Sequence, residues 1–163
     1  MAGTGDQRKT ERAMTDEDFM GLALAEARAA SERGEVPVGA VVVLDGRVIG
    51  GGGNRTITDC DPTAHAEVVS LRAAAQALGN HRILGATLYV TVEPCAMCAG
   101  AIIQARILRV VYGCDDPKGG AARSCFRVFE HPALNHPVEV TGGVLAEDCV
   151  AALQSFFAAR RSS

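Results

Sequence analysis

The sequence predicts an α/β protein with three layers, in which helices cover both faces of a mixed five-stranded sheet. Its size supports this class, because 163 residues suit a single domain that can bury an adequate core. Its composition also fits, since 48% hydrophobic and 21% charged residues are typical of a globular chain. Finally, segments with helical periodicity alternate along the chain with short apolar runs typical of buried strands.

The order of elements follows from local signals. Thr15 can cap a helix with an acidic first turn. Asp45-Gly46 between apolar runs predicts a hairpin, the glycines at 50–53 indicate a close approach of the backbone, and Pro94 fits the first turn of a helix. The expected elements are a disordered polar leader (1–14), a helix from Thr15 to about Gly34, strands at 38–44 and 47–49, a helix between Thr63 and Gly79, a strand at 86–92, a helix at 94–104, a strand at 107–112, a loop-rich stretch with a short helix (113–137), a strand at 138–141 and a helix at 146–161.

Composition and charge exclude several classes of protein. The chain has no apolar run near 18 residues and no hydrophobic signal core at its N-terminus, so we expect neither a membrane span nor export, and we predict a cytoplasmic protein. A net charge of −3 restricts any nucleic-acid contact to a local basic patch. In a cytosolic chain, cysteines favour metal binding or catalysis over disulfides.

One group of residues has the pattern of a catalytic zinc site. His65, Cys95 and Cys98 are of the residue types that zinc prefers, and the two cysteines lie three residues apart at the start of a helix. Three protein ligands leave one tetrahedral position open, as in catalytic sites. Glu67, two residues after His65, is the candidate general acid and base, although helical spacing alone does not place both side chains together.

Other interpretations of these residues stay open. Cys95 and Cys98 alone could be a redox pair, and a structural zinc site would need a fourth ligand, for which Cys60 is the rival. The four cysteines outside the zinc pair are expected to be small buried hydrophobic residues: Cys60, Cys114, Cys125 and Cys149.

The chain resembles the bacterial tRNA-specific adenosine deaminases of the cytidine/deoxycytidylate deaminase superfamily. His-x-Glu followed by Pro-Cys-x-x-Cys is the known signature of zinc nucleobase deaminases, so the reaction class is inferred from this resemblance. The chain departs from the family at Gly53, where an aromatic residue is frequent, and at Cys114-Asp115. The resemblance covers residues 17–161 and includes Val36-Pro37-Val38-Gly39-Ala40, Asn54-Arg55, Asp61-Pro62-Thr63-Ala64-His65-Ala66-Glu67, Thr87-Leu88-Tyr89-Val90-Thr91, Glu93-Pro94-Cys95, Met97-Cys98-Ala99-Gly100-Ala101, Arg109-Val110-Val111-Tyr112-Gly113, Asp116-Pro117-Lys118, Gly120-Ala121 and Asn135-His136.

The resemblance implies a cytidine-deaminase-like sandwich over residues 15–163, which would form the zinc deaminase domain. It implies a homodimeric hydrolase with one zinc per subunit that converts adenosine to inosine at the wobble position of a tRNA anticodon, in an arginine tRNA. A zinc-bound hydroxide would attack C6 of adenine, with Glu67 as the proton shuttle. The residues that would bind the base are the Asn54 side chain, the Ala66 main chain, Glu35, Val36 and Pro37.

Contacts to the RNA backbone are expected from basic residues near the pocket, with an ordinary solvated surface as the alternative for each. The basic candidates are Lys118, Arg123, Arg127, Arg160 and Arg161, and Asp116 is a further candidate RNA contact. Two other functions compete with tRNA editing. One is the deamination of a free base or nucleoside of the cytosine or guanine type, and the other is a non-enzymatic zinc-stabilised binding module.

Overall fold

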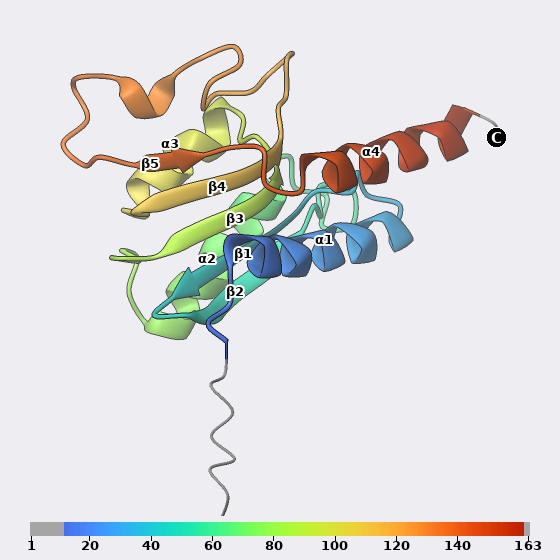
Figure 1. Ribbon diagram of the computed structural model, residues 1–163. Coiled ribbons are helices and arrows are strands. Elements are labelled where there is room, and N and C mark those ends of the chain that lie inside the picture. Colours follow the sequence, from blue (N-terminus) through green and yellow to red (C-terminus); the bar gives the residue numbers. More distant parts are fainter. Residues whose placement is uncertain (1–11, 162–163) are drawn as a thin grey trace, which may run out of the picture.

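The computed structural model describes residues 12–161, and residues 1–11 of the expected leader lie outside the described residues. Figure 1 shows one sheet with helices on both faces, which confirms the predicted three-layer architecture. Within residues 12–161, no helix combines the length and the apolar character needed to cross a membrane. The elements are α1 (Asp16–Glu32), β1 (Gly39–Leu44), β2 (Arg47–Gly53), α2 (Ala66–Leu78), β3 (Thr87–Val92), α3 (Ala96–Gln104), β4 (Arg109–Cys114), the 3₁₀ helix η1 (Val128–Glu130), β5 (Glu139–Thr141) and α4 (Ala146–Arg161).

The sheet is mixed and has five strands in the order β2-β1-β3-β4-β5, as predicted. β1 pairs antiparallel with β2 and β3, whereas β3, β4 and β5 run parallel. Asp45 and Gly46 form the predicted hairpin turn with positive φ angles of 51° and 76°. Because β3 and β4 are parallel, the segments that follow Val92 and Cys114 leave the sheet at the same edge.

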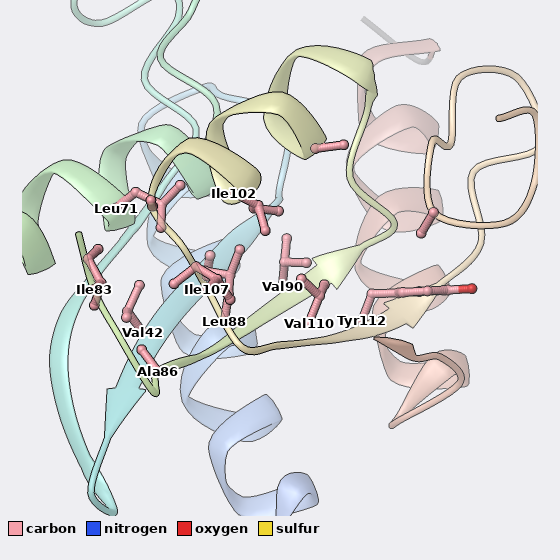
Figure 2. Packing of buried hydrophobic residues seen from close by; sticks show 14 of the residues in the cluster. Val42, Leu71, Ile83, Ala86, Leu88, Val90, Ile102, Ile107, Val110 and Tyr112 are labelled. Atoms are coloured by element: carbon pink, nitrogen blue, oxygen red, sulfur yellow. The ribbon is translucent and has the colours of Figure 1, made fainter. Parts of the chain in front are cut away.

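Each face of the sheet carries its own core, because successive side chains of a strand point to opposite faces. α1 and α4 cover the face that presents Val41, Val43, Tyr89 and Val111. α2 and α3 cover the other face, where Figure 2 shows Leu71 and Ile102 packed over Val42, Leu88, Val90 and Val110. Strands buried on both faces have continuous apolar sequences, which is why the strand predictions rested on apolar runs rather than on alternation.

Strand β2 is longer than predicted, because it continues through the glycines at 50–53. A Cβ atom at Gly50 would lie 2.5 Å from the backbone nitrogen of Ala74 in α2, and one at Gly53 would lie 2.7 Å from Cβ of Ala30 in α1. The glycines therefore let one helix pack closely on each face of the strand, as the predicted close approach requires.

The apolar face of α4 differs from the prediction. The spacing of Val150, Leu153, Phe156 and Phe157 predicts that they share one apolar face. In the structure Cys149 and Phe156 are buried, whereas Val150 and Phe157 are 39% and 44% exposed. α4 packs mainly against α1, β3 and β4, so only a narrow stripe of the helix is covered. The apolar stripe that the sequence predicts for α4 is therefore wider than the part of the helix that neighbouring elements cover.

The cysteines outside the predicted zinc pair fall into two classes. Cys114 and Cys149 are buried, as expected, but the prediction was wrong for Cys60 and Cys125, which are exposed. Both exposed thiols lie in loops and donate to a nearby carbonyl, of Ile57 and Pro117 respectively. The six cysteines of the chain are all free thiols.

A polar network fixes the start of α1 to the sheet. Thr15 and Asp18 form the predicted helix cap reciprocally, each side chain accepting from the other's backbone N–H. Asp16 accepts hydrogen bonds from both Arg109 terminal nitrogens, at 2.9 and 2.7 Å, and from the hydroxyl of Tyr89 at 2.7 Å. The hydrogen bonds from Arg109 lower the pKa of Asp16 below its ordinary value of 3.8, against the effect of burial and with help from Tyr89.

Asp16→Asn is therefore expected to destabilise the fold at neutral pH, and to destabilise it less in acid. A carboxyl whose pKa is lower in the folded state contributes stability above its unfolded pKa, and that contribution is lost as the pH falls through the folded pKa. Urea denaturation of both proteins at about pH 7 and about pH 3 measures the difference. If the two proteins differed equally in free energy of unfolding at both pH values, the stabilising role assigned to the Asp16 charge would be contradicted.

Candidate active site

The three candidate metal ligands come from the beginnings of two helices that pack on the same face of the sheet. His65 is the N-cap of α2 and Cys95 is the N-cap of α3, each with extended backbone. Cys98 lies in the first turn of α3 and is buried. Because α2 and α3 contact each other, their N-terminal ends bring residues 30 or more positions apart into one group.

The distances within this group fit a tetrahedral metal. Nδ1 of His65 lies 3.6 Å from Sγ of Cys95 and 3.4 Å from Sγ of Cys98. Zinc bound to sulfur at about 2.3 Å and to nitrogen at about 2.0 Å requires a sulfur–nitrogen separation of about 3.5 Å. The three ligand atoms lie within 4.8 Å of one another, so the side chains already have the spacing that zinc would impose.

The electrostatics of the group favour thiolate ligands. Hydrogen bonds from the thiol of Cys98 and the ring of His65 lower the pKa of Cys95 to about 3, and the thiolate in turn raises the pKa of His65. The hydrogen bond to Cys95 and burial raise the pKa of Cys98, which holds the shared proton. A metal ion would replace these protons, since only the deprotonated side chains can bind it.

Glu67 lies beside the ligand group without belonging to it. It is buried, with 4% of its surface exposed. Its carboxyl interacts electrostatically with Cys95, His65 and Cys98. Burial, together with the Cys95 thiolate, raises the pKa of Glu67 to about 7. A carboxyl with a pKa near neutrality can both accept and donate a proton at physiological pH.

The structure also explains how Glu67 and His65 reach the same place. His65 has a ψ of 154° and stands outside the helix, so the rule that residues two apart in a helix diverge does not apply to this pair. The rival ligand Cys60 is not a member of the metal group found among the described residues, and its exposed thiol donates to Ile57 instead. The position of His65 between the two sulfur atoms favours a metal centre over a redox pair.

Of the residues expected to bind the base, Asn54 and Ala66 adjoin this group, whereas Glu35 contacts the loop after Asn54. Oδ1 of Asn54 accepts a hydrogen bond of 2.8 Å from the backbone N–H of Ala66, which fixes the orientation of the Asn54 amide next to His65. Glu35 is buried, and its carboxylate accepts from Thr56, Ile57 and Thr58. It therefore holds the loop after Asn54, a role that its sequence position did not indicate.

Pro37 and Arg160 border a different hollow. A groove of about 820 Å³ runs between α1 and α4, and both residues line it, whereas His65, Cys95 and Cys98 do not. Arg160 donates to the carbonyl of Gly34 at 2.6 Å and lies 4.4 Å above the ring of Phe156. The guanidinium of Arg160 is thus fixed near the turn that leads into Glu35 and Pro37.

Asp116, Lys118, Arg123 and Arg127 lie in the loop after β4, whereas Arg161 is the last residue of α4. Asp116 accepts from the backbone N–H of Lys118 and Gly119, and Arg123 donates to the carbonyl of Val140 at 2.8 Å. This loop is tied to the segment before α3 through Glu93, for which the sequence analysis predicted no role. The carboxylate of Glu93 accepts from four backbone N–H groups of the loop, and the signal for it was an acidic residue directly after an apolar strand.

Comparison with known proteins places the chain among deaminases. A model of the MafB19-like deaminase family matches residues 14–161. The tRNA-specific adenosine deaminase of Agrobacterium fabrum is 54% identical over 143 residues, which are 88% of this chain and 94% of that protein. The tRNA-specific adenosine deaminase of Haemophilus influenzae is 52% identical over 151 residues, or 92% of this chain and 87% of that protein.

Solved structures agree with these relatives. A structure from a study of A-to-I editing by tRNA:A34 deaminases superimposes with a TM-score of 0.80 at 55% identity, covering 83% of this chain and 98% of that one. The guanine deaminase of Nitrosomonas europaea superimposes with a TM-score of 0.78 but is only 25% identical, covering 88% of this chain and 85% of that one. The chain therefore belongs to the family of tRNA-specific adenosine deaminases, within the MafB19-like deaminases.

Proposed function

We propose that this enzyme removes the C6 amino group of adenosine at the wobble position of a tRNA anticodon, producing inosine and ammonia. The observation that supports this most directly is the group of His65, Cys95 and Cys98 with buried Glu67 beside it. It occurs in a chain that is 54% identical to a tRNA-specific adenosine deaminase. Both the substrate and the reaction class are inferred from that relationship, and the side chains have the chemistry that this reaction needs.

His65, Cys95 and Cys98 would hold one zinc ion per subunit. Their sulfur–nitrogen distances of 3.6 and 3.4 Å match tetrahedral zinc, and three protein ligands leave a fourth position for water or substrate. When bound, zinc supplies Lewis-acid activation of water, which makes a strong nucleophile at neutral pH.

Glu67 moves the protons. It accepts a proton from the attacking water and delivers it to ring N1 of adenine, and a second transfer, from the new C6 hydroxyl to the amino group, lets ammonia leave. The oxygen of water remains on C6, so adenosine and water give inosine and ammonia. A pKa of about 7 suits Glu67 to both the accepting and the donating step.

The base would be held by Asn54 and by the turn at residues 35–37. The Asn54 amide, oriented by the Ala66 N–H, would hydrogen-bond to the base, and the turn of Glu35, Val36 and Pro37 would form a wall of the pocket. Because a base stacked in a helix cannot reach a buried site, the wobble nucleotide would be flipped out of the anticodon loop. Lys118, Arg123 and Arg160 would contact the RNA backbone, with Asp116 shaping the loop that carries the first two.

We also propose that the enzyme is a cytoplasmic homodimer that edits an arginine tRNA, as the resemblance implies. Free thiols throughout the chain suit a reducing compartment. On α3, Ala99 and Ile102 are buried within the subunit, so a partner would instead meet the exposed side of that helix, where Met97 is 39% exposed. Analytical ultracentrifugation at micromolar concentration tests the dimer.

Inosine formation tests the proposed function. The zinc-loaded protein is incubated with an anticodon stem-loop of an arginine tRNA that carries adenosine at the wobble position, and with the same stem-loop carrying guanosine there as a control. We expect inosine in the first RNA only. Turnover of free guanine or cytidine without any inosine would instead support a free-base deaminase like the Nitrosomonas relative.

A further inference from the structure

Glu93 is a buried acidic residue at the junction between α3, which carries Cys98, and the loop after β4. It follows the last residue of β3 and stands two positions before Cys95. Its side chain is 3% exposed, although it is a carboxylate. Nothing in the proposed chemistry uses it, so its burial needs another reason.

The reason is a dense set of hydrogen bonds from one loop. The carboxylate accepts backbone N–H bonds from Asp116 at 3.1 Å, Ala122 at 3.1 Å, Arg123 at 2.8 Å and Ser124 at 2.9 Å, and it also accepts from the hydroxyl of Ser124. Burial raises the pKa of Glu93, but the hydrogen bonds from Ser124 and Arg123 outweigh it and leave the pKa below its ordinary value.

The loop is shaped around this carboxylate. Between β4 and η1 the chain forms turns without helix or strand, so its backbone N–H groups need acceptors elsewhere. A Cβ atom at Gly120 would lie 2.3 Å from the carboxyl carbon of Glu93, which shows how closely the loop wraps it. The backbone of Ala121 adds a bond of 2.8 Å to the carbonyl of Pro94, the residue before Cys95.

The same loop carries side chains that the proposed function assigns to RNA. Asp116 and Arg123 donate their own backbone N–H groups to Glu93. Lys118 follows indirectly, because Asp116, held by Glu93, accepts its backbone N–H at 3.1 Å. One carboxylate thus sets the position of three candidate RNA contacts relative to the ligand Cys95.

We propose that Glu93 is a positioning residue that holds the loop of residues 115–124 in register with the metal ligands, so that the RNA backbone is bound while the flipped base lies at the metal. This inference rests on the proposed function, because it assigns the loop to RNA binding. Glu93 does not touch the substrate. Its effect passes through the loop, so substrate binding should respond to its loss more than the chemical step does.

Glu93→Gln keeps the size of the side chain but replaces one acceptor oxygen with an NH₂ group that faces N–H donors. Because fixing even one loop residue is worth about tenfold in binding, we expect the KM for the anticodon stem-loop to rise about 10- to 30-fold. We expect kcat to change by less than about threefold and zinc to remain at one per subunit, since no metal ligand or proton-transfer group is altered. The dependence of log KM on log salt should become shallower, because fewer phosphates are contacted in one fixed arrangement.

Two further variants separate positioning from general stability. Ser124→Ala removes only the hydroxyl donor to Glu93, and we expect it to raise KM about threefold in a fully folded protein. Asp16→Asn removes a charge with several hydrogen bonds at the opposite end of β3 and β4, and we expect it to lower the melting temperature without changing KM. Ser124→Ala carries the test if Glu93→Gln fails to fold.

The inference is overturned if Glu93→Gln and Ser124→Ala, folded and zinc-loaded, both keep the KM of the parent enzyme. It is equally overturned if kcat falls while KM stays constant, or if Asp16→Asn raises KM as much as Glu93→Gln does. Failure of the proposed function gives a different result, because the parent enzyme itself would then make no inosine from the stem-loop.

Discussion

Glu67→Gln is expected to reduce inosine formation about 10²- to 10⁴-fold, the range that a positioned general acid and base contributes. Gln has nearly the shape of Glu and can still accept the local hydrogen bonds, but it cannot take a proton from water or give one to the base. Glu67 is not one of the metal ligands, so zinc should remain bound at one ion per subunit. Rates of inosine formation on the stem-loop, together with metal analysis of the same preparation, measure both quantities.

The control for this variant is Glu147→Gln on α4. It removes the same charge from an exposed helix position and should leave the rate unchanged. The comparison also decides between an enzyme and a non-enzymatic zinc module. A non-enzymatic module would form no inosine, with or without the substitution at Glu67. Full activity of Glu67→Gln with zinc bound would refute the proposed proton shuttle and leave the role of the buried carboxyl unexplained.

The pH dependence follows from the same residue. A base that must be ionised to accept the first proton loses activity as the pH falls through its pKa, which burial raises to about 7 for Glu67. If the base were an ordinary exposed glutamate, the enzyme would lose activity only near pH 4.3. A metal in the site would stabilise the ionised carboxylate and move the loss of activity to lower pH. The expected result is therefore that the rate of deamination decreases as the pH is lowered.

Much of the fold could be predicted because its signals are local. The Thr15 cap, the Asp45-Gly46 turn and the apolar runs of the central strands depend on residues near each other in sequence, and all of these predictions are confirmed. The errors arise where burial depends on a distant neighbour. Val150 belongs to an apolar stripe, yet α4 has too few neighbours to cover it. Gly50 pairs with Val42 in the sheet, and α2 packs so closely on it that a side chain would not fit.

The site divides in the same way. His65 and Cys95 can be predicted as metal ligands from their residue types and spacing. The residues around them also predict that both lie at the start of a helix. The carboxylates of Glu35 and Glu93 could not be assigned, because each binds a loop 21 to 31 residues away and no short motif records such a contact. Sequence reasoning finds the groups that perform chemistry more easily than the groups that hold them in place.

Cys95→Ala is expected to abolish both zinc binding and deamination. Cys95 is the ligand with the lowest thiol pKa of the pair, about 3, and its thiolate also orients the ring of His65. Without it, His65 and Cys98 remain, and two protein ligands are fewer than the three that catalytic zinc sites use. Zinc content should fall from one per subunit to near zero, and activity should fall with it to the background of the assay.

The fold itself should survive this change, because Cys95 is only partly buried and lies outside both hydrophobic cores. Cys114→Ala is the matched control, since it removes a thiol buried in the core on the other side of the sheet. That variant should lose stability, by about 1–3 kcal/mol for a small buried side chain, but keep its zinc and its rate. If Cys95→Ala kept one zinc per subunit while remaining active, the metal would be held by other residues and the site assigned here would be wrong.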